Sequence, residues 1–221
     1  MARRAARQAE ADRNDRALLT AAKEVLSSEG SHASVAGIAA RAGVGIASVY
    51  RRYRTKEELF QHLCVLALDQ RIGAAQTGIA MTDPWAGLVH YVTQALEFGG
   101  GSLGSLAGTI QVTDDMARAF VRADELRTLL LDRAHTAGVL RDDVTAVDLD
   151  LLVEQLGQPS LVEHLATQGR DDQLDIARAA RRRIVMLALD GLRPGTPPLP
   201  GPPPPPHLLT QRWHDPVHPP A

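Results

Sequence analysis

The sequence predicts an all-α protein with an N-terminal three-helix unit, a larger helical domain behind it and a proline-rich tail. Its apolar residues are mostly Ala, Leu and Val, a mixture that favours helices over strands. They recur at spacings of three and four residues, which is the period of one helical face. The sequence contains no alternation of apolar and polar residues long enough for a strand. At 221 residues the chain has room for two cores.

The first helix is expected to begin at Asn14, behind a basic segment. Residues 1–13 are polar and rich in Arg, without bulky apolar side chains, so we expect a mobile arm there. From Asn14 the apolar residues follow helical spacing as far as Val25 and Leu26, and Gly30 is suited to end the helix.

Two short helices joined by a tight turn are expected next. Ser34 can cap the first of them, and Gly43 can end it in a left-handed turn. The second covers residues 46–53. Thr55 then caps a longer helix, with Glu58 three residues on to complete a capping box. Two short helices with a small turn form a helix-turn-helix, whose second helix enters the major groove of DNA.

The remaining helices are expected over residues 84–98, 114–137, 146–168 and 171–192. Pro84 suits a first helical turn, and Gly138 suits a helix end. Pro159 falls inside the third range and removes a backbone donor, so we expect a kink or break near Gly157. The last helix has apolar positions too widely spread for one neighbour, which indicates two packing partners.

From Arg193 the composition changes to Pro and Gly, which favours extended polyproline II. We expect an unstructured tail; a Pro-x-x-Pro motif that docks into an aromatic groove is the alternative. The helix after Thr55 should continue to about residue 77. The predicted organisation is a basic arm, a helix-turn-helix domain, a ligand-binding and dimerisation domain, and a tail, over residues 1–13, 14–60, 61–192 and 193–221.

Charge separates the front of the chain from the rest. Residues 1–56 carry 11 basic and 5 acidic side chains, whereas residues 57–221 carry 13 and 21, although the whole chain has a net charge of −2. Only residues 1–56 have the positive charge that favours binding to a polyanion such as DNA, because Lys and Arg release the counterions condensed on it. The charged N-terminus lacks a signal-peptide pattern and no apolar stretch could span a membrane, so we expect a cytoplasmic protein.

Other chemistries find little support in the sequence. Residues 99–104 match Gly-x-Gly-x-x-Gly, but they follow a helix and open no strand-turn-helix unit, so we interpret them as a flexible connector. The single cysteine, Cys64, has apolar neighbours that favour a buried thiol. No set of nucleophile, base and orienting residue indicates an enzyme. The histidines at 90, 135 and 164 lack metal-site spacing, so we expect neither metal nor cofactor.

The segment from Ser34 to Leu59, SVAGIAARAGVGIASVYRRYRTKEEL, resembles the DNA-binding signature of the tetracycline-repressor (TetR) family of bacterial regulators. The specific part of the resemblance runs from Leu18 to Phe60. In that family the Ala-Gly-Val turn, the Tyr that ends the recognition helix, an aromatic residue three positions on and Lys-Glu-Glu-Leu occur together. The rest of the chain, to about Leu192, resembles the family's regulatory domain more loosely.

The resemblance implies roles for nine residues. Phosphate contacts are implied for Ser34, Tyr50, Arg52 and Lys56, and positions facing base edges for Gly45, Ile46, Ala47, Ser48 and Arg51. Arg51 can bind a guanine bidentately. Gly45 and Ile46 replace the polar residues that are common at these places in the family, so Ile46 and Ala47 are expected to contact thymine methyl groups instead. Arginines 3, 4 and 7 of the arm are either minor-groove contacts or part of a disordered tail.

The resemblance also implies how such a regulator works. We expect a homodimer through the last two helices, 146–168 and 171–192, on double-stranded DNA with twofold symmetry. A small apolar effector would bind between the middle helices and release a repressor from its operator. Candidate pocket residues, which ordinary core packing would also explain, are Trp85, Tyr91, Phe98, Met116, Phe120 and His135. The alternatives are a regulator or activator without a small-molecule switch, and an enzyme built on a helical bundle.

Overall fold

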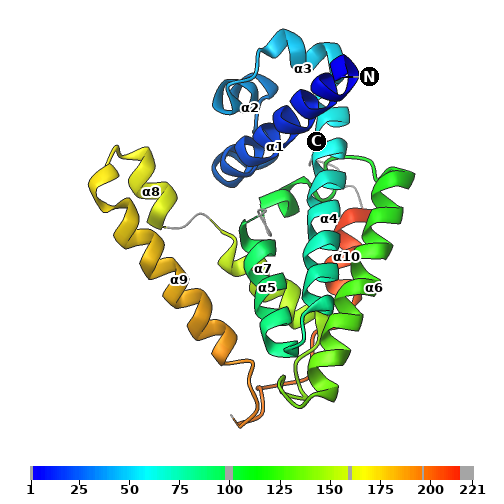
Figure 1. Cartoon of the computed structure of the whole chain (residues 1–221), viewed down its shortest axis with the longest axis vertical. Helices are drawn as coiled ribbons and strands as arrows, with labels where there is room; N and C mark the ends of the chain where they lie inside the picture. Colours follow the sequence, from blue (N-terminus) through cyan, green and yellow to red (C-terminus); the bar gives the residue numbers. More distant parts are fainter. Residues whose placement is uncertain (1, 98–101, 159–160, 196, 215–221) are drawn as a thin grey trace, which may run out of the picture.

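The computed structural model describes residues 2–97, 102–158, 161–195 and 197–214, and within these ranges its regular structure is entirely helical, as predicted (Figure 1). The α-helices are α1 (Ala2–Glu29), α2 (Val35–Ala42), α3 (Ile46–Arg52), α4 (Lys56–Ala80), α5 (Pro84–Glu97), α6 (Asp114–Thr136), α7 (Ala146–Leu156), α8 (Leu161–Thr167), α9 (Leu174–Asp190) and α10 (His207–His214). Short 3-10 turns are η1 (Gly30–His32), η2 (Ser102–Leu106) and η3 (Asp171–Gln173).

Helix α1 begins at Ala2 rather than at Asn14, which corrects the expectation of a mobile arm over residues 1–13. The prediction gave weight to the lack of bulky apolar residues there. Ala, Arg, Gln and Glu nevertheless have high intrinsic helix propensity, so a helix already stabilised by packing farther along can extend through them. The basic segment is therefore a helical extension of the first core helix.

The turns around the two short helices form as predicted, with one difference. The Ser34 hydroxyl accepts a hydrogen bond from the Gly37 amide at 3.0 Å, and Gly43 has a φ of 66°, in the left-handed region that favours glycine. Thr55 accepts from the Glu58 amide at 3.0 Å. The expected capping box is incomplete, because the Glu58 carboxylate accepts from the amide of Arg54 at 2.7 Å instead of the Thr55 amide.

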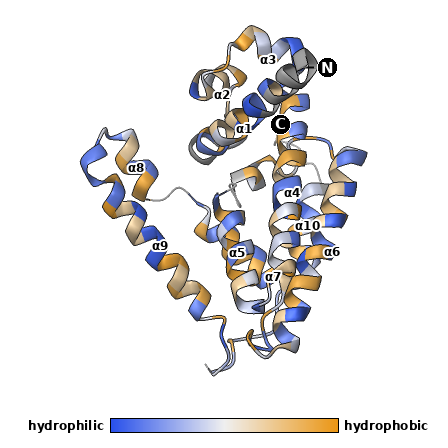
Figure 2. Cartoon of the chain, in the orientation of Figure 1, coloured by the Kyte–Doolittle hydropathy of each residue, from blue (hydrophilic) through white to orange (hydrophobic). Residues whose placement is uncertain are grey.

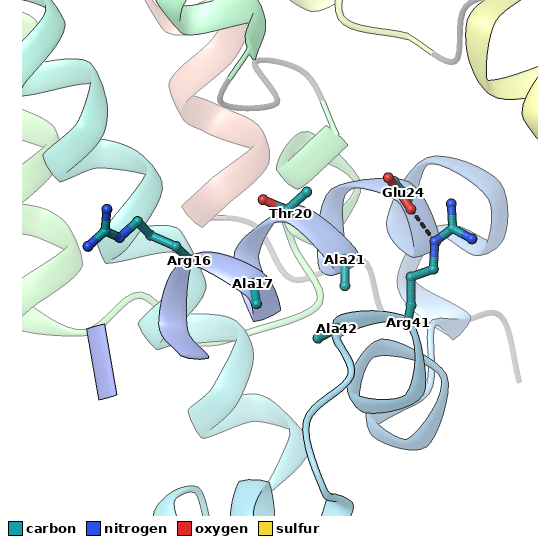
Figure 3. Close-up of a pocket in the computed structure, with 7 residues that line it drawn as sticks. All are labelled: Arg16, Ala17, Thr20, Ala21, Glu24, Arg41 and Ala42. Carbon is teal, nitrogen blue, oxygen red and sulfur yellow. Dashed lines mark hydrogen bonds and ion pairs between the residues drawn. The ribbon is translucent and has the colours of Figure 1, made fainter. Parts of the chain in front are cut away.

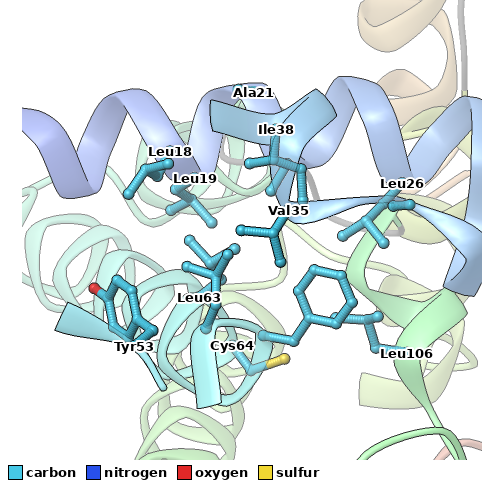
Figure 4. Packing of buried hydrophobic residues seen from close by; sticks show 14 of the residues in the cluster. Leu18, Leu19, Ala21, Leu26, Val35, Ile38, Tyr53, Leu63, Cys64 and Leu106 are labelled. Carbon is cyan, nitrogen blue, oxygen red and sulfur yellow. The ribbon is translucent and has the colours of Figure 1, made fainter. Parts of the chain in front are cut away.

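The core of the DNA-binding unit is formed mainly by apolar side chains of the first four helices, and Leu106, Ile110 and Met116 complete it (Figure 4). Leu19, Ile38, Leu59 and Leu63 are essentially inaccessible to solvent. Cys64 is buried beside them, as expected, and burial raises its pKa to about 12. The thiol is therefore a packing group at neutral pH.

The second core lies between α4, α5, α6 and α7. It includes Leu88, Leu130 and Leu149, all of them buried. Helices α4 and α5 cross where two glycines meet: a Cβ on Gly78 would lie 2.6 Å from the Gly87 carbonyl oxygen, and one on Gly87 would lie 2.3 Å from the Gly78 oxygen. No other residue permits so close an approach of two backbones.

The predicted helix over residues 146–168 is broken near Gly157, as expected. Gly157 caps the C-terminus of α7, and α8 starts at Leu161. Pro159 itself lies outside the described residues. Beyond the break, α8 and α9 form a hairpin that projects from the body of the molecule (Figure 1).

Helix α9 joins the body at its C-terminal end, where Val185 and Leu189 belong to the second core. Several large apolar residues of the hairpin are exposed to solvent. The hydropathy colouring of the ribbon marks hydrophobic positions along α9 (Figure 2). These exposed residues are Leu161, Ile176, Ile184, Met186 and Leu187. The helix buries one side in its own chain and leaves the other uncovered.

The segment after Arg193 departs from the expected unstructured tail, because residues 207–214 form helix α10. Trp213 packs against the first core, and Arg212 pairs with Glu154 on α7. The prediction followed the run of prolines and overlooked the His-Leu-Leu-Thr-Gln-Arg-Trp-His segment behind it, which has apolar residues and no proline. None of the described helices is long and apolar enough to cross a membrane.

Candidate DNA-binding site

Helix α3 presents most of the predicted base-reading residues to solvent. Val49 is buried and anchors the inner side of the helix against the first core. On the outer side Ile46 is 41% exposed and Tyr50 is 51% exposed, which is unusual for large apolar or aromatic side chains. Gly45, Ala47 and Arg51 are also exposed, and Ser48 is half-buried. An apolar and aromatic surface flanked by arginines is therefore available to a partner.

The side chain of Arg51 lies along its own helix. Its Nη2 donates to the Ser48 hydroxyl at 3.1 Å, one helical turn earlier. This contact holds the guanidinium near the N-terminal part of α3, where a recognition helix reaches base edges. Most of the donors of the guanidinium stay available, since one hydrogen bond uses one of five N–H groups.

Arg52 has an intramolecular partner that sequence reasoning missed. Its two Nη atoms donate to the two carboxylate oxygens of Asp15 on α1, at 2.6 and 2.8 Å. Tyr53 is buried, and its hydroxyl donates to the same carboxylate at 3.3 Å. Burial, followed by the charge of Asp15, raises the pKa of Tyr53 far above its usual value. The Arg52–Asp15 pair thus fixes α3 on α1.

Ser34 and Lys56 also have local structural roles. Ser34 is exposed, and its hydroxyl accepts from the Gly37 amide, which leaves its own hydrogen free to donate outward. Lys56 lies in the first turn of α4, where its Nζ donates to the Ser31 carbonyl at 2.9 Å and lies 5.2 Å from the centre of the Phe60 ring. Both residues fix the ends of the helix-turn-helix.

A shallow hollow lies beside this unit, between α1 and α2 (Figure 3). The small side chains of Ala17, Ala21 and Ala42 line it, and an ion pair between Arg41 and Glu24 crosses one end. The hollow is open to solvent and results from alanines at a helix crossing. It has the form of a surface depression rather than of an enclosed ligand cavity.

A comparison with known protein families identifies the N-terminal domain. A sequence model of the family described as "Bacterial regulatory proteins, tetR family" matches residues 18–63. Residues 18–63 are therefore a DNA-binding domain of the TetR type. They cover the helix-turn-helix with its exposed α3 and the first turns of α4, so the findings support a DNA-binding transcriptional regulator. No curated protein matches the sequence.

Solved structures of TetR-family regulators share the fold. The regulator SCO0520 of Streptomyces coelicolor is 25% identical, with a TM-score of 0.54 over 82% of this chain and 99% of its own. A regulator of Mycobacterium vanbaalenii is 24% identical, with a TM-score of 0.54 over 84% of this chain and 98% of its own. LfrR of Mycobacterium smegmatis, in complex with proflavine, is 23% identical, with a TM-score of 0.50 over 84% and 99%.

The predicted pocket residues do not converge on one site. Trp85 and Tyr91 are buried in the second core, whereas Met116 packs in the first. Phe120 is 42% exposed on α6. His135 lies 3.2 Å from the Arg141 carbonyl through its Nε2. Phe98 lies outside the described residues.

A charged junction that the sequence did not reveal joins α4, α5, α6 and α7. Asp150 on α7 accepts from Arg71 on α4 at 2.7 Å and from Arg127 on α6. Arg71 also donates to the Tyr91 hydroxyl on α5 at 3.1 Å. Burial lowers the pKa of Arg127. The partners are far apart in sequence. The sequence could therefore indicate this junction only by a charged residue within an apolar helical pattern.

Proposed function

We propose that this TetR-family regulator is a repressor that binds a twofold-symmetric operator as a homodimer and leaves it when a small molecule binds. The observation that carries the DNA-binding part is the exposed face of α3, on which Ile46 and Tyr50 are uncovered while Val49 holds the helix in the core. Large side chains at the surface of a braced helix suit insertion into the major groove. Such a protein acts in the bacterial cytoplasm and has no catalytic role.

Base contacts are assigned to the residues at the start and outer face of α3. Arg51 is expected to bind a guanine, with its guanidinium oriented by Ser48. Ile46 and Ala47 are exposed and apolar, which suits thymine methyl groups. Gly45 leaves room for the backbone to approach a base edge. Specificity then combines one bidentate hydrogen-bonded contact with apolar contacts.

Phosphate contacts are assigned to residues that flank this face. Tyr50 has an exposed hydroxyl on a rigid ring, and the Ser34 hydroxyl retains a donor. Lys56 adds a positive charge at the N-terminus of α4, where backbone amides also attract an anion. Arg52 offers the second N–H of each Nη while Asp15 holds the first. These contacts set the register without reading sequence.

The dimer is assigned to the α8–α9 hairpin. Several large apolar side chains of this hairpin are exposed, and a second copy of the same surface would bury them by twofold symmetry. A symmetric dimer requires a symmetric operator.

The effector of the repressor is expected to be a small apolar molecule that binds between the middle helices and separates the two recognition helices. Support comes from the relative LfrR, which was solved in complex with proflavine. The dispersed positions of the candidate pocket residues favour a second candidate, a DNA-binding regulator or activator without a small-molecule switch.

Binding of purified variants to a selected operator and to random duplex DNA tests the assigned contacts. Tyr50→Ala and Lys56→Ala should weaken binding to both DNAs, because phosphates are common to all sequences. Arg51→Ala should weaken operator binding by about 1–3 kcal/mol and leave random DNA nearly unaffected. Equal losses of Arg51→Ala on both DNAs would remove its assignment to base reading.

Titration of the operator complex with a library of small metabolites distinguishes the two candidate functions. The repressor with a switch predicts that at least one compound releases DNA at saturation, and transcription in vitro from a promoter overlapping the operator should then rise. Transcription that increases when the protein alone is added would instead identify an activator.

A further inference from the structure

Helix α10 is attached to the regulatory domain by a paired ionic contact. The two Nη atoms of Arg212 donate to the two carboxylate oxygens of Glu154 on α7, at 3.0 and 2.5 Å. The Glu154 side chain is only 20% exposed. A guanidinium and a carboxylate joined by two parallel hydrogen bonds form the strong and directional type of ion pair. The end of α10 is therefore held in one orientation.

The neighbouring residue of α10 reaches the core of the DNA-binding unit. Trp213 is half-buried and packs against the first core, as does Leu103 of η2. The ion pair lies beside Gly104 of η2. A Cβ on this glycine would lie 3.9 Å from the Glu154 carboxylate and 4.0 Å from the Arg212 guanidinium. The C-terminal segment thus lies where α7, η2 and the DNA-binding core meet.

A second attachment joins the chain that precedes α10, at residues 197–199, to the regulatory domain. Arg141 donates to the Pro197 carbonyl at 2.5 Å, and the Leu199 amide donates to the Asp143 carboxylate at 2.8 Å. Between the two attachments the prolines of residues 202–206 are mostly exposed. A polyproline segment is stiff, so it loses little entropy when its two ends are bound.

We propose that residues 207–214 are an internal ligand, for which the chain contains a binding site. In this site the Glu154 carboxylate accepts the hydrogen bonds of Arg212, and the η2 region of the first core packs against Trp213. Occupation of this site ties the DNA-binding unit to the regulatory domain. The ligand class is a short helical peptide with Arg followed by an aromatic residue. The inference does not depend on the repressor function.

Tryptophan fluorescence tests the proposal in the full-length chain. The sequence has two tryptophans, so Trp85→Phe leaves Trp213 as the only one. In this background the emission of Trp213 should be protected from acrylamide, and Arg212→Glu or Glu154→Arg should each increase quenching at least twofold. Arg118→Ala is the matched control, because it removes an exposed ion pair, with Asp115, that lies within α6.

Charge exchange separates loss of the contact from loss of the fold. The double variant Glu154→Arg with Arg212→Glu should restore the protection of Trp213, because the pair is re-formed with its charges reversed. Protection that persists in Arg212→Glu, or that the double variant does not recover, would overturn the proposal.

A labelled peptide of residues 205–214 supplies a test in trans. Full-length Arg212→Glu should bind this peptide, because its own tail has left the site, and full-length Glu154→Arg should bind it at least tenfold more weakly. Peptide concentrations up to the millimolar range are needed, since the tethered segment has an effective concentration of that order. Equal binding to both variants would contradict the assignment of Glu154.

Discussion

At the scale of single residues, the arginines of α3 differ in how much of the protein they already contact. Arg51 has one neutral partner on its own helix, whereas Arg52 has a buried carboxylate on another helix. The resemblance implied DNA contacts for both, because a sequence pattern does not show which distant side chain lies opposite each arginine. Asp15 lies 37 residues before Arg52, and no local spacing connects them.

Removing the Arg52 side chain should destabilise the fold as well as weaken DNA binding. Arg52→Ala leaves the Asp15 carboxylate, whose side chain is only 10% exposed, without its main donor. Loss of a buried charged partner costs about 1–3 kcal/mol in the free energy of unfolding. Urea unfolding should show this loss, and Arg51→Ala, the matched control, should stay within about 0.5 kcal/mol of the unchanged chain. Equal stability of the two variants would assign Arg52 to DNA alone.

At the scale of elements, α4 connects the two cores and depends on a close crossing with α5. It carries Leu59 and Leu63 in the first core and Ala75 in the second. Near its C-terminus, Gly78 meets Gly87 without room for a Cβ on either. Helical periodicity predicted both helices, but not their distance, because the contact is between backbones rather than between apolar side chains.

Two glycines of α4 should respond differently to alanine. Gly78→Ala places a Cβ against the backbone of α5, so overpacking should lower the free energy of unfolding by about 1–3 kcal/mol. Gly73→Ala, on the same helix with nothing within 4 Å of its Cβ, should leave stability unchanged or raise it by up to about 1 kcal/mol. Thermal or urea unfolding measures both. The crossing is wrongly described if Gly78→Ala is as stable as Gly73→Ala.

The segment between Arg193 and α10 should be sensitive to acid where it contacts Asp143. Hydrogen bonds from Arg141 and from the Leu199 amide lower the pKa of Asp143 from its ordinary value of 3.8 to about 2. Because the folded pKa is below the unfolded one, the carboxylate stabilises the fold above pH 4, and this contribution is lost as the pH falls towards 2.

The measurement is the difference in unfolding free energy between the unchanged chain and Asp143→Asn as a function of pH. This difference should be largest above pH 4 and should shrink as the pH approaches 2. A difference that is constant across this range would show that the Asp143 carboxylate has no such role.

At the scale of the whole molecule, the sequence predicted the helical class, most helix ends and the break at Gly157. It did so because caps, glycine turns and apolar spacing are local signals. The docking of α10 and the junction around Asp150 were not predictable in the same way. Each depends on residues brought together by the fold, such as Arg212 and Glu154, which are 58 positions apart.

The uncovered face of α9 predicts an oligomer whose disruption is specific to that surface. Leu187 is 63% exposed on α9 and Leu129 is 52% exposed on α6. Leu187→Glu should convert the dimer to monomer in sedimentation equilibrium, since a charge would be buried in an apolar interface. Leu129→Glu should stay dimeric. Dissociation by both substitutions, or by neither, would place the interface elsewhere.

Selection of bound sequences from random duplex DNA by the full-length protein tests most directly the claim that a dimer reads DNA through α3. The account predicts enrichment of a twofold-symmetric sequence whose half-sites are centred about one helical turn, roughly 10 base pairs, or a multiple of it apart. It also predicts that Arg51→Ala changes the preferred bases at symmetric positions. Enrichment of a single unpaired half-site, or no enrichment at all, would contradict it.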